Sequence, residues 1–342
     1  QPALYTGTTG AQDITFSGHS DLAPDWLWFK ARNAASNHFL FDKLRGVLKT
    51  ISSDDTTAEV TSTGSMTAFG TDGFSLGDGG SDNDINGVSG TTYVAWGWAA
   101  NGSGSSNEDG SINTTATSAN TTAGFSISTY TGNATVGATV GHGLGIAPKV
   151  VIVKSRSNAE SWIFGHDSVG WTKAMYMNST ATPYTLDIYW NNTAPTSSVV
   201  ELHDHVVTNG SGATYVMYAF AEIPGYSSFG SYTGNGSTNG TFVYTNGMKP
   251  AFVILKRTNA TQEWQMYDTQ RDSYNVADHK LETNSSNAES ILTGNNNLDF
   301  LSNGFKLRQA NGGMNASGST YIYMAFAENP FGGDGAAPAT AR

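Results

Sequence analysis

One short stretch of the chain occurs three times, and it limits the possible folds more than any other feature. The three copies are GTTYVAWGWAA (Gly90–Ala100), GATYVMYAFAE (Gly212–Glu222) and GSTYIYMAFAE (Gly318–Glu328). Alternate residues of a strand point to opposite faces, and both faces of these copies carry apolar or small side chains. Each copy is therefore predicted to be a strand buried on both sides, in the middle of a layered β-domain. Helix is the competing interpretation, but the Tyr, Val, Ile and Thr content favours strand.

Other segments recur in the same order around this closing strand. Each unit opens with Tyr-Thr-Gly, and a Pro later begins an apolar run that ends in Lys, which predicts a central strand. The Tyr-Thr-Gly motifs begin at Tyr5, Tyr130 and Tyr232, and the runs are Pro24–Lys30, Pro148–Lys154 and Pro250–Lys256. Two further strands per unit are predicted at 48–52 and 73–76, at 175–178 and 199–202, and at 280–283 and 304–307. Five or more short strands in about 100 residues are typical of a β-sandwich.

The predicted fold class is therefore all-β, with three tandem β-sandwich repeats of the jelly-roll or lectin-like kind. The repeats are expected at 1–100, 124–223 and 224–331. Residues 101–123 are rich in Gly, Ser, Thr and Asn without an apolar period, which predicts a linker or an extended arm. Residues 332–342 are expected to form a flexible tail.

Each unit also carries a Lys at the end of its apolar run and an Asp about one hairpin later. The pairs are Lys30 and Asp42, Lys154 and Asp167, and Lys256 and Asp268, with an aromatic residue between the two members (Phe39, Trp162 and Trp264). A structural ion pair across adjacent strands is the favoured interpretation, because buried charges need partners. A Lys/Asp site for a ligand is the alternative.

Composition excludes several classes of protein. The net charge is −11 without a cluster of Lys or Arg, so no nucleic-acid partner is expected. There is no cysteine, so neither disulfides nor thiolate metal sites can form. No apolar stretch is long enough to cross a bilayer as a helix, so no membrane insertion is expected.

The chain resembles a family of known but uncharacterised proteins. The run from Asp109 to Lys149, which includes Gly141-His-Gly-Leu-Gly-Ile-Ala-Pro-Lys149, and the closing Tyr321–Phe331 carry this resemblance. They are similar to the tandem repeat domain of structural, tail-fibre-like virion proteins of tailed phages, particularly phages of marine bacteria. The resemblance spans essentially the whole chain and implies a virion component, but it supplies no catalytic motif. The first unit lacks the Gly-His-Gly-Leu-Gly segment, so its role is expected to differ.

Motifs for catalysis and metal binding are sparse. The glutamates show no closely spaced acidic run of the kind that glycan-processing sandwiches use, and neither a Gly-x-Ser-x-Gly elbow nor a Walker loop occurs. His203 and His205 share one face of a strand, and Asp78–Asp84 is an acidic Gly-rich loop. An exposed strand and a plain turn are the favoured interpretations, so no catalytic residue, metal or cofactor is predicted.

Two tryptophans are the candidate ligand-binding residues. Trp171 and Trp190 have polar loop neighbours, so they are the best candidates for an exposed surface on which sugar rings stack. Burial or subunit packing is the favoured alternative for both.

The sequence therefore predicts a non-enzymatic phage virion protein located on the particle surface. The leading hypothesis is a tail-fibre or tail-tip adhesion module that contacts host polysaccharide. The alternatives are a capsid or tail decoration protein that binds only other virion proteins and, more weakly, an envelope-glycan depolymerase. A homo-oligomer, with a trimer favoured, is expected, although three joined copies could mimic that symmetry within one chain.

Overall fold

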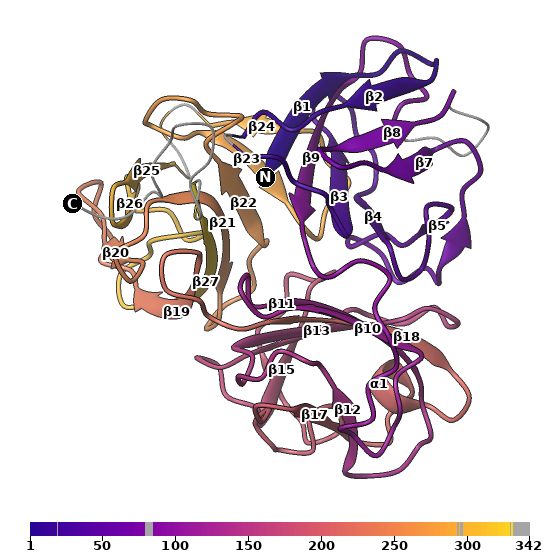
Figure 1. Ribbon diagram of the computed structural model, residues 1–342. Coiled ribbons are helices and arrows are strands. Elements are labelled where there is room, and N and C mark those ends of the chain that lie inside the picture. The colour runs from indigo at the N-terminus through magenta and orange to yellow at the C-terminus, as the bar shows by residue number, and fades with distance from the viewer. Residues whose placement is uncertain (19, 79–84, 293, 295–296, 329, 331–342) are drawn as a thin grey trace.

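The computed structural model describes residues 1–18, 20–78, 85–292, 294, 297–328 and 330. It is nearly all β-structure, with 40% of residues in strands and 1% in a helix, so the predicted all-β class is confirmed. All three copies of the repeated stretch are strands, which excludes the helical alternative. We call β1–β9, β10–β18 and β19–β27 the first, second and third units, and Figure 1 shows them as three lobes.

The strands have the following bounds. The first unit contains β1 (Pro2–Thr6), β2 (Gln12–Ile14), β3 (Trp26–Ala31), β4 (Phe39–Asp42), β5 (Lys49–Thr50), β6 (Val60–Thr61), β7 (Met66–Phe69), β8 (Phe74–Leu76) and β9 (Thr92–Trp98). The second contains β10 (Ala116–Asn120), β11 (Phe125–Thr131), β12 (Ala138–Gly141), β13 (Val150–Ser155), β14 (Ile163–His166), β15 (Lys173–Tyr176), β16 (Tyr184–Thr185), β17 (Val199–Leu202), a short helix α1 (Val206–Asn209) and β18 (Thr214–Phe220). The third contains β19 (Ser227–Thr233), β20 (Phe242–Tyr244), β21 (Pro250–Arg257), β22 (Gln265–Asp268), β23 (His279–Glu282), β24 (Ser290–Ile291), β25 (Leu298–Leu301), β26 (Gly304–Leu307) and β27 (Thr320–Ala327).

The same strand order recurs in the large sheet of each unit. The orders are β1-β9-β3-β4, then β11-β18-β13-β14 and β19-β27-β21-β22, so the closing strand always lies between the opening strand and the Pro-initiated strand. Every pairing is antiparallel. A small sheet accompanies each large one: β2-β8-β7, β12-β17 and β20-β26-β25. Side chains of the large and small sheets share one apolar core within each unit.

The segment 101–123, expected to be a linker or arm, contains a strand. Its β10 pairs with β11 over five residues and forms the edge of the second large sheet. Asn101 and Ser105 are also tied to the strand, because the backbone N–H of Asn101 donates to the Ser118 hydroxyl and Ser105 bridges to Thr117.

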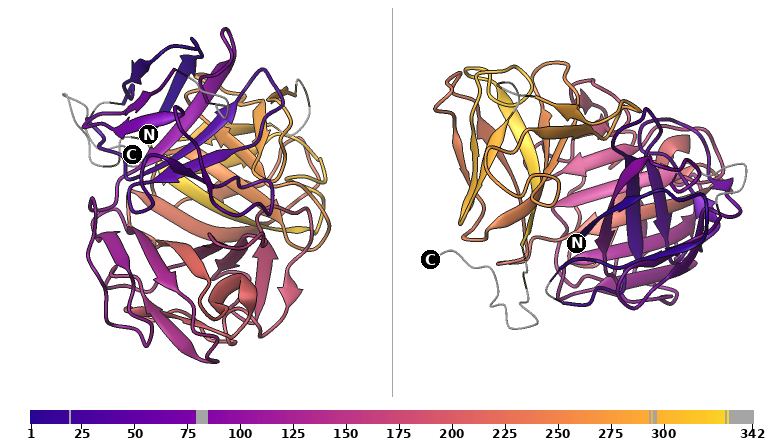
Figure 2. Two further views of the ribbon diagram at one scale, coloured as in Figure 1. Left: turned by 90° about the vertical axis from the view of Figure 1, so that its right-hand side faces the viewer. Right: turned by 90° about the horizontal axis from the view of Figure 1, so that it is seen from above.

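The closing strands have one face in their own unit and the other face in a shared core. In β18, Tyr215 and Met217 belong to the core of the second unit, whereas Tyr218 and Phe220 belong to a cluster with members from all three units. Corresponding positions of β9 and β27 divide in the same way. The large sheets thus surround a common apolar axis, and Figure 2 shows the three lobes packed against one another.

Hydrogen bonds from buried rings join the units in a closed cycle. The Trp162 indole of the second unit donates to the Ser52 carbonyl of the first at 2.6 Å, and the Trp264 indole of the third donates to the Tyr176 carbonyl of the second at 3.1 Å. His38, rather than the expected Phe39, occupies the corresponding position of the first unit. Its Nε2 lies 2.9 Å from the Glu282 carbonyl of the third unit.

The ring of His38 is fixed in one tautomer. The Trp28 indole can only donate, and its Nε1 lies 2.8 Å from Nδ1 of His38, so Nδ1 accepts and the proton is on Nε2. Burial lowers the pKa of His38 well below its usual value, which keeps the ring neutral. The neutral ring therefore donates to the Glu282 carbonyl as the two indoles donate in the other units.

The predicted Lys–Asp ion pairs are wrong. The three lysines are buried, and each donates to a carbonyl of the neighbouring unit: Lys30 to Ser286 at 3.2 Å, Lys154 to Thr56 at 3.3 Å and Lys256 to Thr180 at 2.7 Å. Burial lowers the pKa of each of these lysines to about 8.

Strand register explains why these pairs do not form. Asp42 lies opposite Trp26, at the end of β3 far from Lys30, and its carboxylate pairs with Arg45. Asp268 lies opposite Phe252 and pairs in the same way with Arg271. In the second unit the equivalent residue is His166, which lies opposite Val150. Asp167 is the residue after it, and its carboxylate pairs with Lys149 at the surface.

Removing the inter-unit indole bond should destabilise the protein. We expect Trp264→Phe to lower the free energy of unfolding by about 0.5–1.5 kcal/mol more than Trp190→Phe, because it removes a buried indole N–H that donates to the Tyr176 and Ser179 carbonyls of the second unit. Trp190 is the matched control: it is equally buried, but its Nε1 has no hydrogen-bond partner in the described structure. Urea unfolding measures both variants, and equal losses would contradict a stabilising role for the bond.

Stability should fall in mild acid because of the buried histidines. His166, whose Nε2 lies 3.3 Å from the Tyr323 carbonyl of the third unit, has its pKa lowered by burial to about 4. The unfolded chain takes up this proton below about pH 6.5, so stability is lost from there down to about pH 4, by ~3 kcal/mol for this residue. His166→Phe should flatten the pH dependence of the urea midpoint in that window. An unchanged slope would show that His166 is not held neutral.

Candidate functional site

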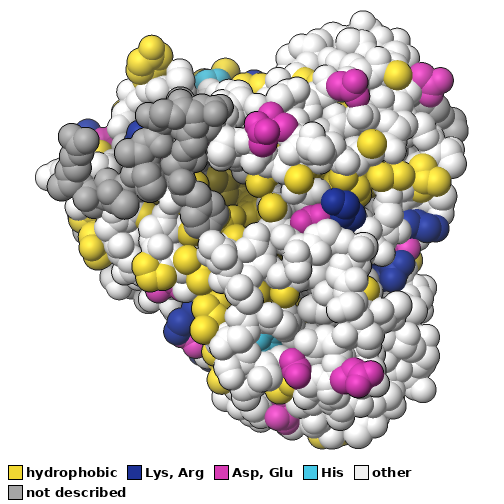
Figure 3. All heavy atoms as spheres, in the orientation of Figure 1, with side chains coloured by type: hydrophobic (Ala, Val, Ile, Leu, Met, Phe, Trp, Pro, Cys, Tyr) yellow, Lys and Arg dark blue, Asp and Glu magenta, His cyan; other side chains and the backbone are white. Residues whose placement is uncertain are grey.

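A cleft of about 420 Å³ opens where the three units meet at one end of the shared axis. Figure 3 shows hydrophobic side chains within the hollow between the lobes. The first unit contributes most of one wall and the third unit most of the other, and the remaining side chains come from the start of the second unit and from the connection that follows β18. The lining includes Gln1, Ser17, Ser20, Asp21, Trp96, Trp98, Asn120, Ala123, Tyr226, Phe252, Thr269, Gln270, Phe326 and Glu328.

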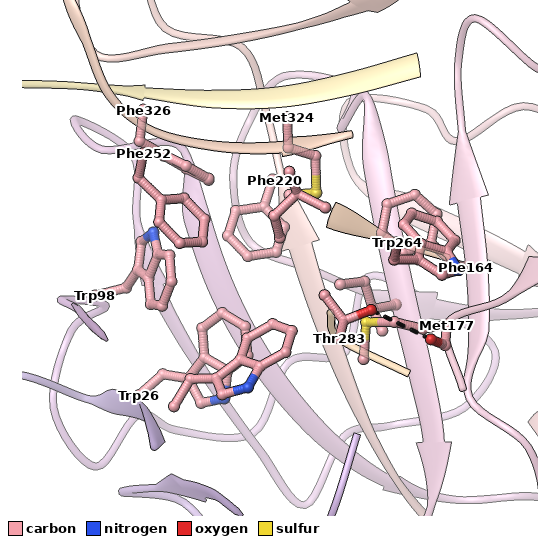
Figure 4. Close-up of a pocket in the computed structure, with 13 residues that line it drawn as sticks. Trp26, Trp98, Phe164, Met177, Phe220, Phe252, Trp264, Thr283, Met324 and Phe326 are labelled. Carbon is pink, nitrogen blue, oxygen red and sulfur yellow. Dashed lines mark hydrogen bonds between the residues drawn. The ribbon is translucent and has the colours of Figure 1, made fainter. Parts of the chain in front are cut away.

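Aromatic rings form the floor of the cleft. Trp98 packs edge-to-face against Phe252 and Phe326, with ring centroids 5.7 and 5.6 Å apart. Figure 4 shows these three side chains together at the end of the axial cluster. The same rings line a void of about 10 Å³ on the axis, which has room for at most about one water molecule. The floor is therefore part of the packed core, and a ligand would bind above it.

The rim of the cleft is polar. Asp21 and Glu328 bring carboxylates, and Asn120 and Gln270 bring amides. Glu328 is paired with Lys249, so its charge is partly neutralised. The described lining contains no histidine, lysine or arginine. The chemistry that it offers is apolar contact at the floor and hydrogen bonding at the rim, which suits a compact ligand with one apolar face.

Trp171 and Trp190, the predicted sugar-stacking residues, are not at this cleft. They are 6% and 0% exposed and belong to the core of the second unit, where their rings meet edge-to-face at 5.6 Å. Neither ring offers an exposed face, so the structure supports the core-packing alternative for both.

A glycine explains why these two tryptophans turn inward. A Cβ on Gly165 of β14 would lie 2.5 Å from the Trp171 ring and 3.0 Å from the Trp190 ring. The equivalent residues of the first and third units are Phe41 and Tyr267, which are both buried. The tryptophan pair therefore fills the space that an aromatic side chain of the strand occupies elsewhere. In the sequence, the sign that the two tryptophans pack inward is that position 165 carries a glycine where the other two units carry an aromatic residue.

The two histidines weighed as a metal pair have separate roles. His203 pairs with Asp204 at 2.5 Å, and His205 caps α1 by accepting from the Val207 N–H at 3.2 Å. In the acidic Asp78–Asp84 loop, residues 79–84 lie outside the described part of the chain.

Sequence reasoning missed another group, which the fold brings together from a turn and a strand. Side-chain ligand atoms of Asp272, Asp278 and His279 lie within 4.8 Å of one another. The Nδ1 of His279 already hydrogen-bonds to Asp272 and lies 3.4 Å from Asp278. The group is thus internally paired, and its half-buried imidazole bridges two carboxylates.

Comparison with known proteins identifies the family. A model described as a domain of unknown function, DUF7483, matches residues 1–330, so the chain belongs to this family. No curated protein and no solved structure matches the chain. In the described part of the chain, no helix is long and apolar enough to cross a membrane.

The cleft should bind a small apolar probe. We expect Nile red to gain fluorescence with about one site per chain, because aromatic side chains form the floor. Thr269→Trp, which adds bulk at the rim, should abolish the signal, whereas Thr61→Trp on the exposed strand β6 should not. A dye signal that survives Thr269→Trp would show that the probe binds elsewhere.

Proposed function

We propose that the protein is a non-enzymatic structural protein of a phage virion, a tail-fibre, tail-tip or other surface module that contacts host polysaccharide. The observation that carries this proposal is the closed ring of three equivalent units around one apolar axis. Fibre and tip proteins commonly assemble around a threefold axis, and this chain has the same arrangement within a single polypeptide. It supports the resemblance of the sequence to tail-fibre-like repeats.

In this proposal each unit is a β-sandwich of the jelly-roll or lectin-like kind. The support is that each unit places a large antiparallel sheet and a small sheet around one apolar core. The outer face of each sandwich is then free to contact ligands or other proteins, and the inner face holds the ring together. A rigid ring suits a part of the particle surface that must hold its shape outside the cell.

A decoration or assembly protein without a receptor role is the second candidate. Individual apolar side chains on the surface would be available to a partner protein on this alternative. Val88, Tyr274 and Ile291 are 59%, 86% and 62% exposed. On this alternative the partners are other virion proteins, and the cleft and outer faces are contact surfaces within the particle.

The closed ring of units also bears on the oligomeric state of the protein. Because one chain already closes its own ring, we favour a single chain over the homotrimer that the sequence suggested. Mass photometry of the purified protein should show one species with the mass of one chain. A trimer at nanomolar concentration would show instead that three rings associate.

Immunogold labelling of intact phage particles that carry this protein tests the function directly. We expect gold at the tail fibres or tail tip. Labelling confined to the capsid, without polysaccharide binding by the purified protein, would favour decoration. Absence of label from intact particles, with the protein detected in the same lysate, would contradict a place on the virion surface.

A further inference from the structure

The outer face of the third small sheet carries a row of three unlike side chains. Phe242 on β20 lies opposite Lys306 on β26, which lies opposite Asp299 on β25. The intervening residues, Val243, Phe305 and Phe300, point into the core. Figure 1 shows β20, β25 and β26 on the side of the third lobe that faces away from the other two units.

The aromatic end of this row is exposed. Phe242 and Tyr244 occupy alternate positions of β20, so they share a face, and they are 43% and 56% exposed. Gly304 lies opposite Tyr244, and a Cβ there would meet the Phe242 ring at 3.0 Å and the Val243 carbonyl at 2.1 Å. The glycine thus keeps the surface beside the two rings low and open.

The charged end of the row has unused hydrogen-bonding capacity. Asp299 is 6% exposed, and its Oδ2 accepts from Arg308 at 2.7 Å, but its Oδ1 has no partner in the described structure. Lys306 is half-buried and forms no salt bridge within the described part of the chain. A buried carboxylate oxygen without a donor is costly, so a donor group that reached this end of the row would relieve that cost.

The other two units do not have this combination. Cross-strand partners at the same place are Asp13 and Ser75 in the first unit, and Thr139 and Glu201 in the second. Neither pair contains an aromatic or a cationic side chain. The row is therefore a feature of the third unit alone, and the shared architecture does not require it.

We propose that this outer face, formed by Phe242, Tyr244, Lys306 and Asp299, binds a pyranose unit of a polysaccharide. The apolar face of a sugar ring packs on the exposed aromatic side chains. Its hydroxyl groups accept from the ammonium of the half-buried Lys306, and a small outward turn of Asp299 would let its Oδ1 accept from a second hydroxyl group. Hydrogen bonds to charged groups are the stronger kind. This inference rests on the proposed adhesive function and locates its ligand site on the third unit, away from the cleft.

Charge favours an acidic sugar. The patch brings two cations, Lys306 and Arg308, and one carboxylate, Asp299, on a chain whose overall charge is −11. A uronic acid carboxylate therefore finds a local excess of positive charge, whereas most of the surface repels it. The bound polysaccharide is expected to be uronic-acid-containing, and its affinity should fall as salt is raised.

Affinity gel electrophoresis of the full chain tests the site, with alginate, dextran and a panel of bacterial exopolysaccharides in the gel. We expect retardation by acidic polysaccharides that Phe242→Ala and Tyr244→Ala each reduce about tenfold in affinity, a loss equivalent to about 1.4 kcal/mol. Lys306→Met should weaken binding and reduce its salt dependence. Thr139→Ala and Ser75→Ala, at the equivalent positions of the other units, are the matched controls and should bind as the wild type does.

The outcomes separate this site from the proposed function. Binding that survives Phe242→Ala and Tyr244→Ala, but is lost in Thr269→Trp, would place the glycan in the cleft and overturn the present inference while leaving adhesion intact. If no polysaccharide retards the protein, the inference is overturned. Gold labelling of the particle would then support the role of a decoration protein. Circular dichroism and urea midpoints equal to those of the wild type show that the variants are folded.

Discussion

Burial of the closing strands on both faces is the constraint on which the rest of the structure depends. β9, β18 and β27 each pack one face against their own small sheet and the other face against the common axis. A single unit would expose the second face, which carries rings such as Trp96 and Phe220, to water. The units therefore need one another. Joining three copies in one chain makes their association intramolecular and removes most of its entropic cost.

Apolar burial alone does not fix how the units are oriented, and buried polar groups supply that specificity. Hydrophobic contact is non-directional, whereas an indole or ammonium group must face its acceptor. Trp162, Trp264 and His38 each reach a carbonyl of a neighbouring unit, and the three buried lysines do the same. A rotation of one unit about the axis would remove the acceptors of the two indoles and of His38, at a cost of about 1–3 kcal/mol each. The lysines would keep the carbonyls that they reach in their own units but lose those of the neighbouring units. The inter-unit hydrogen bonds therefore select one orientation of the units among the many that would bury the same apolar surface.

The strands could be predicted from the sequence because their signals are local. The repeated Tyr-rich stretch and the Pro-initiated runs specify strands and faces without reference to the rest of the chain. The Lys–Asp pairing was wrong because it depends on register, and Asp42 lies opposite Trp26 rather than near Lys30. Trp171 packs in the core, which was the favoured interpretation, but the space that it fills is left by Gly165 on another strand, so the sequence around Trp171 does not decide between burial and an exposed ring. The cleft joins segments of all three units, and no local pattern predicts which of them meet.

The three units are alike where they touch and different where they face solvent. Positions on the axis are apolar in all three units, and each unit offers a ring N–H to a carbonyl of a neighbouring unit. In the described part of the chain, the outer cross-strand pairs of the small sheets form no hydrogen bond or ion pair with another unit, so substitutions there should not disturb the ring. The outer cross-strand pair is Asp13 and Ser75 in the first unit but Phe242 and Lys306 in the third. A ring held together from within can therefore carry a different surface on each lobe, and a ligand-binding property is expected on one lobe rather than on all three.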